Sequence, residues 1–157
     1  MNPSTNQPPI SFPENAQRRA AITSGIQATT GLDEAVLEHL VRNFYATARH
    51  DEIIGHLFDG VTDWDKHIAK ITTFWSSVGL LTGRYHGQPL VAHLPLPLEP
   101  SHFARWLVLF EQTARDTCSP AGAHYLMEKA HRIAKSLEIG VAVSRSCRPV
   151  RAPGHEQ

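Results

Sequence analysis

The sequence around which the fold is expected to form is Asp63–Trp106, DWDKHIAKITTFWSSVGLLTGRYHGQPLVAHLPLPLEPSHFARW. In its first part apolar residues recur every three or four positions, which indicates an amphipathic helix from Trp64 to about Leu81. Asp63 is a suitable N-cap for this helix, and Gly83 ends it. The stripe expected to face inward contains one histidine among apolar residues: His67, Ile71, Phe74, Trp75 and Val78.

The second part of the stretch, Arg84–Pro100, is rich in proline and cannot form a long helix. One short turn from Pro89 to His93 is expected, because proline is favoured at the first position of a helix. Leucines and a valine surround His93 in the sequence. An imidazole in such a place is either hydrogen-bonded packing, the commoner case for a lone histidine, or a metal ligand. As a ligand it would bind through Nε2 and would need an acceptor for its Nδ1–H.

On both sides of this stretch the same periodicity predicts further helices and no strand, so the expected fold class is all-α. The expected helices run from Glu14 to about Ala28, from a cap at Asp33 to about Arg49, from Ser101 to about Thr117 and from about Pro120 to Val143, with a short apolar turn at Ile53–Phe58. Residues 1–13 are interpreted as a disordered arm and residues 144–157 as a disordered tail. The predicted domain therefore covers residues 14–143.

The composition is that of an ordinary globular protein, and its balanced charge does not indicate a highly charged partner. Its 157 residues suit one domain, and 15 basic residues balance 15 acidic ones, so nothing attracts nucleic acid or an anionic membrane over long range. The two cysteines form no CxxC or CxxCH motif, which favours free thiols in the cytoplasm over covalent cofactor attachment. No signal peptide and no run long enough for a membrane helix is present in the sequence.

Three other residues place a polar group on an apolar helix face. His67 precedes His93 by a long helix and a broken loop, which could place the two imidazoles on opposite sides of a flat ligand. Tyr45 and Trp106 each carry one donor, which is either satisfied by a carbonyl in the core or directed at a small ligand. Together these residues suggest a flat apolar cofactor with a metal at its centre, bound by His93.

Longer motifs resemble those of group III truncated haemoglobins. They are NFYATARHDEIIGHLF (residues 43–58), DWDKHIAKITTFWSSVGLLTGRYHGQPLVAH (residues 63–93) and HFARWLVLF (residues 102–110). The resemblance extends over roughly residues 32–137. Its most specific part is the YHGQPxxxH run followed by FxxW, and the glycine pairs of other truncated globins are not evident.

The resemblance implies a globin-like two-over-two helical sandwich around haem b. His93 matches the proximal iron ligand, while Tyr45, His67 and Trp106 match residues of the distal side. His67 would be a donor, a gate or a sixth iron ligand. Phe58 matches the phenylalanine that packs on the haem face. The remaining matched positions are pocket-wall residues and two propionate contacts: Ile71, Phe74 and Trp75 for the wall, and Lys70 and Tyr85 for the propionates.

The resemblance implies diatomic ligands, namely O2, NO and CO, and leaves two functional classes open. In the first, the protein is an enzyme that converts nitric oxide to nitrate or reduces peroxide, and it needs a separate reductase. In the second, it binds, transfers or senses a gas without turnover. A third alternative has no haem and treats the histidines as core and surface residues of a helical interaction module.

Overall fold

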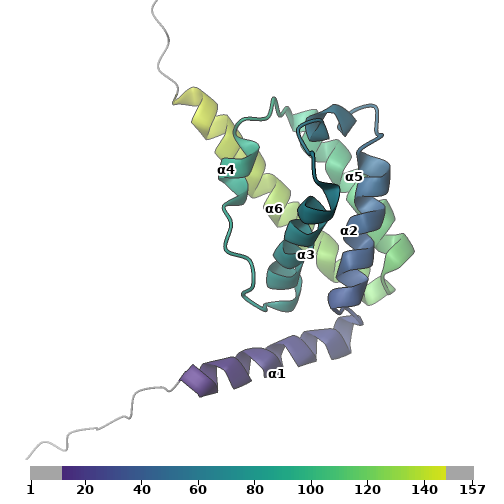
Figure 1. The fold of residues 1–157 in the computed structure, drawn as a ribbon, viewed down its shortest axis with the longest axis vertical. Helices are drawn as coiled ribbons and strands as arrows, with labels where there is room; N and C mark the ends of the chain where they lie inside the picture. Colours follow the sequence, from purple (N-terminus) through teal and green to yellow (C-terminus); the bar gives the residue numbers. More distant parts are fainter. Residues whose placement is uncertain (1–11, 148–157) are drawn as a thin grey trace, which may run out of the picture.

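The computed structural model describes residues 12–147 and is shown in Figure 1. The helices in order are α1 (Phe12–Thr30), α2 (Glu34–Ala48), the 3-10 helix η1 (Gly55–Phe58), α3 (Trp64–Leu80), α4 (Pro89–His93), α5 (Pro100–Thr117) and α6 (Pro120–Ser146). No strand occurs within the described residues, which confirms the predicted all-α class. Residues 1–11 and 148–157, which hold most of the predicted arm and tail, lie outside the described part.

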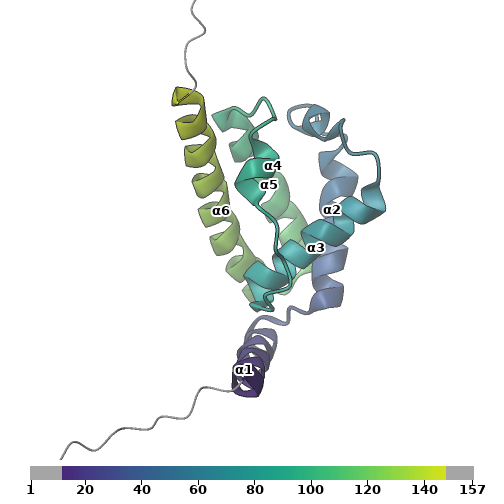
Figure 2. The ribbon, with the colours of Figure 1, turned by 60° about the vertical axis from the view of Figure 1, so that its left-hand side comes forward.

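Two helix pairs form the body of the molecule. Helix α2 packs against α3 and α5, α5 packs against α6, and the short α4 lies on α6 (Figures 1 and 2). The core between the pairs is apolar and fully enclosed, with Leu37, Leu40, Phe110 and Leu126 at 0–2% exposure. Helix α1 lies at one end of this body, where it contacts α3 and α6 (Figure 2).

Side-chain caps set the start of the main helices. The Asp33 carboxylate accepts a hydrogen bond from the Val36 N–H at 2.8 Å, and Asp63 does the same for the Lys66 N–H at 3.0 Å. Both caps were predicted, and both are confirmed. Such caps satisfy backbone donors that have no partner inside the first turn.

Helix ends differ from the sequence prediction at both ends of the described chain. Helix α1 begins at Phe12 and ends at Thr30, so it is longer than expected on both sides. Helix α6 continues to Ser146, so residues 144–146 are helical and the predicted tail boundary is wrong by three residues. The reason is local: no proline or glycine occurs between Val141 and Cys147, and the Cys147 N–H still bonds to the Val143 carbonyl at 3.2 Å.

The face of α3 that packs on protein is not the predicted one. Trp75 is buried as expected, but His67, Ile71, Phe74 and Val78 are only half-buried. The fully packed stripe includes two residues without large apolar side chains, Ser76 and Gly79. The Ser76 hydroxyl donates to Glu34 Oε1 at 2.5 Å, and Gly79 lets Leu126 approach closely. The periodicity of apolar residues does not indicate the burial of a serine or a glycine. The predicted stripe therefore lies on a face of α3 that the rest of the protein covers less fully.

Helix α1 completes the C-terminal end of α3. The Thr23 hydroxyl donates to the Leu80 carbonyl at 2.7 Å, and Arg19 donates to the Thr82 carbonyl at 3.3 Å. Leu81 between them has a φ of 56°, a left-handed conformation that ends the helix. Among the helices of residues 12–147, none is both long and apolar enough to cross a bilayer.

Candidate functional site

His93 is the last residue of the short helix α4, and its imidazole is half-buried. Pro89 at the first position of this helix leaves its carbonyl four residues before His93. The His93 Nδ1 lies 2.5 Å from that carbonyl oxygen, which can only accept, so Nδ1 carries the proton and donates. The remaining nitrogen, Nε2, then has a free lone pair, which is the form in which histidine binds a metal.

His67 lies in an aromatic cluster at the N-terminal end of α3. Its ring centroid is 5.0 Å from that of Tyr45 and 5.7 Å from that of Trp64, and Phe58 adds an edge contact to Tyr45 at 5.4 Å. The His67 Nε2 atom is buried and has no hydrogen-bond partner among residues 12–147. A buried polar atom without a partner is uncommon and points to a missing ligand or water.

Burial keeps the polar groups of this cluster neutral. It lowers the pKa of His67 below the usual value, and the nearby charge of Lys70 lowers that pKa further. Burial also raises the pKa of Tyr45 far above its ordinary value. At neutral pH the site therefore presents a neutral imidazole and a protonated phenol.

A small, partly open cavity of about 20 Å³ lies beside this cluster, between α2, α3 and α5. It has room for about one water-sized molecule. Its lining is Val41, Phe44, Tyr45, Ile71, Trp75, Trp106 and Phe110. The indoles of Trp75 and Trp106 both stack on Phe110, with centroids at 4.8 and 5.1 Å, so three aromatic rings form a continuous wall. Three lining side chains carry an O–H or N–H donor, namely Tyr45, Trp75 and Trp106, and of these Tyr45 and Trp106 are the predicted distal donors.

The structure brings most of the predicted site residues together, but not all. Tyr45 belongs both to the cluster around His67 and to the cavity shared by Ile71, Trp75 and Trp106. Phe74 lies next to this wall and contacts the ring of Tyr85 edge-on at 5.2 Å. Lys70 is exposed, and His93 lies apart on α4, which packs against α6.

Sequence reasoning did not single out several residues of the site. Val41, Phe44 and Phe110 line the cavity, although the sequence indicated only that their helix faces were apolar. Trp64 and Arg49 flank the His67 cluster, where the Arg49 guanidinium carbon lies 4.5 Å from the Trp64 ring centroid. Trp64 precedes His67 by three residues, and this helical spacing could have indicated that the two rings share a face.

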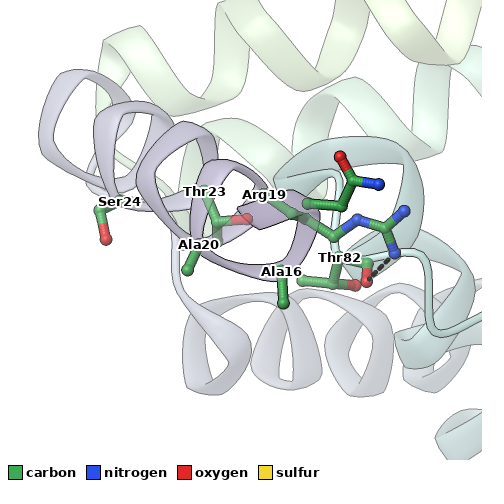
Figure 3. Close-up of a pocket in the computed structure, with 7 residues that line it drawn as sticks. Ala16, Arg19, Ala20, Thr23, Ser24 and Thr82 are labelled. Atoms are coloured by element: carbon green, nitrogen blue, oxygen red, sulfur yellow. Dashed lines mark hydrogen bonds between the residues drawn. The ribbon is translucent and has the colours of Figure 1, made fainter. Parts of the chain in front are cut away.

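A larger, open groove of about 610 Å³ lies at the opposite end of α3 from His67 (Figure 3). It is lined by Asn15, Ala16, Arg19, Ala20, Thr23, Ser24 and Thr82. The Arg19 side chain crosses it to reach the Thr82 carbonyl, as the dashed line in Figure 3 shows. The groove holds none of the predicted site residues, so the candidate site is the aromatic cluster and cavity near α2, α3 and α5, together with His93.

Comparison with known proteins identifies the class to which this fold belongs. No protein-family profile matches the chain. A solved structure described as group III truncated hemoglobin from Campylobacter jejuni superposes with a TM-score of 0.65 at 32% identity, over 70% of this chain and 91% of that one. The fold is therefore that of a haem-binding globin.

The sequence comparison narrows this class to a family. The relative described as "Group 3 truncated hemoglobin ctb", from Campylobacter jejuni, is 33% identical over 113 residues, which cover 68% of this chain and 89% of the relative. The chain belongs to the group III truncated haemoglobin family, and as such it is a haem-binding globin for diatomic gases. The predicted family and globin fold are thereby confirmed.

Proposed function

We propose that the chain holds haem b with His93 as the proximal iron ligand, leaves the sixth position open to O2, NO or CO, and serves to remove nitric oxide or peroxide. The observation that carries this proposal is the contact of His93 Nδ1 with the Pro89 carbonyl oxygen at 2.5 Å. This contact fixes the imidazole in the tautomer whose Nε2 can bind iron. The acceptor is a backbone carbonyl, so a change of the side chain at position 89 would not remove it.

The other residues fit haem as well. The half-buried stripe of α3, with His67, Ile71 and Phe74, is an apolar face that helix packing leaves partly uncovered. A buried His67 Nε2 without a partner suits a position next to an external ligand. In this arrangement Phe58, Ile71, Phe74, Trp75 and Trp106 form the wall, while Lys70 and Tyr85 are the propionate partners.

The distal side chains would orient and stabilise a small polar ligand. Tyr45 is only 7% exposed, and no hydrogen bond to its hydroxyl occurs within residues 12–147. The Trp106 side chain is half-buried, and no hydrogen bond from its N–H occurs within the same residues, so both donors are available in a largely apolar site. Donors already oriented in such a site stabilise developing negative charge better than water does. His67 is the third polar group, and its ring centroid is 5.0 Å from that of Tyr45.

When bound, haem would supply an open iron position and reducing electrons, one for the formation of nitrate from nitric oxide and oxygen and two for the reduction of peroxide to water. Both reactions consume electrons at each turnover, so sustained activity needs a separate reductase. We also propose the cytoplasmic location expected from the sequence. The free thiols of Cys118 and Cys147 agree with a reducing compartment. The alternative is gas binding, transfer or sensing without turnover.

Optical spectra and rapid mixing test these alternatives. We expect purified protein to show a Soret band, a five-coordinate high-spin ferrous spectrum and a carbon monoxide form. A six-coordinate low-spin ferrous spectrum would contradict the open site, and the lack of a Soret band after haem addition would contradict the whole proposal. In stopped-flow mixing with nitric oxide, repeated re-reduction by a cell lysate supports catalysis. A single turnover without re-reduction would support gas binding instead.

A further inference from the structure

The Trp64 indole borders the His67 imidazole on the solvent side of the aromatic cluster. Trp64 is the first residue of α3 and is half-buried, whereas Tyr45, which contacts the same imidazole, is almost fully buried. The imidazole meets the indole at 82° and the phenol at 72°, both edge-to-face arrangements. The indole also contacts the Tyr45 ring directly, with centroids at 5.4 Å. Displacing Trp64 would therefore uncover His67.

Arg49 lies over the Trp64 ring. Its guanidinium carbon is 4.5 Å from the ring centroid, within the range of a cation–π interaction. Arg49 follows the last residue of α2, so this contact joins the end of α2 to the start of α3. No ion pair involves Arg49 among the described residues, and its guanidinium is therefore directed at the indole without competition from a carboxylate.

Packing alone holds the His67 ring in this structure. Its buried Nε2 has no partner, and no hydrogen bond to its other ring nitrogen occurs within residues 12–147. Polar contacts usually fix the orientation of a buried histidine, and here they are absent from the described part of the chain. The imidazole contacts the Tyr45 and Trp64 rings, and of these two Trp64 is the more exposed to solvent.

We infer that Trp64 is a positioning residue for His67: supported by Arg49, it keeps the imidazole turned toward Tyr45, which lines the small cavity, and its displacement opens the route by which a diatomic ligand enters. The part about ligand entry rests on the proposed function. The part about the position of His67 concerns the chain alone and holds whether or not haem is bound.

The position of His67 can be tested by histidine modification. The full chain is treated with diethyl pyrocarbonate, and the rate at each histidine is mapped by mass spectrometry, with the exposed His50 as internal reference. We expect slow modification of His67, a severalfold faster rate in Trp64→Leu, a smaller increase in Arg49→Gln and near-normal protection in Trp64→Phe. Lys66→Ala, which alters an exposed side chain on the same helix turn, is the matched control and should change nothing. Unchanged rates at His67 in Trp64→Leu and Arg49→Gln would overturn the inference.

Ligand entry is tested by carbon monoxide recombination after flash photolysis of the haem-loaded protein. We expect faster association in Trp64→Leu than in the parent. If Trp64 acts through His67, the same substitution should have no further effect in a His67→Ala background. An equal acceleration in both backgrounds would show that Trp64 acts only as bulk at the entrance, and it would overturn the positioning role.

The two proposals fail in different ways. A chain that takes up no haem removes the proposed function, whereas the modification experiment still reports on Trp64 and His67. Normal haem spectra with unaltered modification rates remove the positioning role alone. If circular dichroism shows that Trp64→Leu does not fold, Arg49→Gln decides the question, because it changes only an exposed side chain.

Discussion

The Arg105 guanidinium donates two hydrogen bonds to one carboxylate oxygen of Asp51, from Nε at 3.0 Å and from Nη2 at 2.7 Å. Asp51 lies in the loop after α2 and also accepts the N–H groups of Ile53 and Ile54. Arg105 precedes Trp106 on α5. The pair therefore joins the loop after α2, the helix of Tyr45, to α5, the helix of Trp106.

This pair predicts an acid-sensitive contribution to stability. The hydrogen bonds from Arg105, and then those from the Ile53 and Ile54 N–H groups, hold the pKa of Asp51 below its ordinary value of 3.8. A carboxylate with a lowered folded-state pKa stabilises the fold above its unfolded pKa, and this contribution is lost as the pH falls through the lowered value. We expect Asp51→Asn to unfold at a lower temperature than the parent from neutral pH down to about pH 5.

Thermal unfolding followed by circular dichroism across the pH range checks this. The difference between parent and variant should shrink below about pH 4, as Asp51 becomes protonated. Asp65→Asn, at an almost fully exposed carboxylate with a side-chain exposure of 92%, is the control and should cost little at any pH. A difference between parent and Asp51→Asn that stays constant into strong acid would contradict the assignment.

Replacing His93 should remove the axial ligand of the iron. In His93→Ala we expect loss of haem during purification or a ferrous spectrum without the histidine-bound signature, because no other imidazole has the Pro89 carbonyl contact. Added imidazole should restore much of the parent spectrum. His131→Ala, at an exposed position on α6, is the control. An unaltered axial environment in His93→Ala would refute the proximal assignment.

If Tyr45 and Trp106 donate hydrogen bonds to bound oxygen, the parent protein should release oxygen more slowly than variants that lack one of these donors. A net hydrogen bond contributes about 0.5–1.5 kcal/mol, and about 1.4 kcal/mol corresponds to a tenfold change, so Tyr45→Phe and Trp106→Phe should each speed oxygen dissociation roughly two- to tenfold. Stopped-flow displacement by carbon monoxide measures the rate.

Tyr125→Phe is the matched control for the hydroxyl. Its O–H donates to the Gly79 carbonyl at 2.7 Å and takes no part in the cavity, so its removal should lower stability and leave the oxygen rate unchanged. If both distal variants release oxygen as slowly as the parent, the donor role is excluded.

The contact between α1 and α3 predicts a stability difference between two similar threonines. Thr23→Val leaves the Leu80 carbonyl without the donor that reaches it at 2.7 Å, so the free energy of unfolding should fall by about 0.5–1.5 kcal/mol. The hydroxyl of Thr29 bonds only within its own helix, to the Gly25 carbonyl, and Thr29→Val should have a smaller effect. Urea unfolding measures both. Equal losses would mean that the inter-helix bond adds nothing.

Much of the architecture follows from local sequence. Apolar spacing and the caps at Asp33 and Asp63 determine where α2 and α3 begin, and the prolines of Arg84–Pro100 confine α4 to a single short turn that ends at His93. These features depend on residues that are neighbours in the chain, so they can be predicted without knowledge of the tertiary structure. Long motifs such as YHGQPLVAH carried the family assignment, and the comparisons confirm it.

The tertiary structure decided what each side chain meets. The sequence placed His67 on the inward face of α3, but only packing showed that Ser76 and Gly79 occupy the buried stripe and that His67 retains an unpartnered nitrogen. The Pro89 carbonyl beside His93 and the guanidinium of Arg49 over Trp64 depend on where the backbone and a distant helix end lie. Periodicity records which residues are apolar. Which polar atoms lack a partner is set by the approach of segments far apart in the chain.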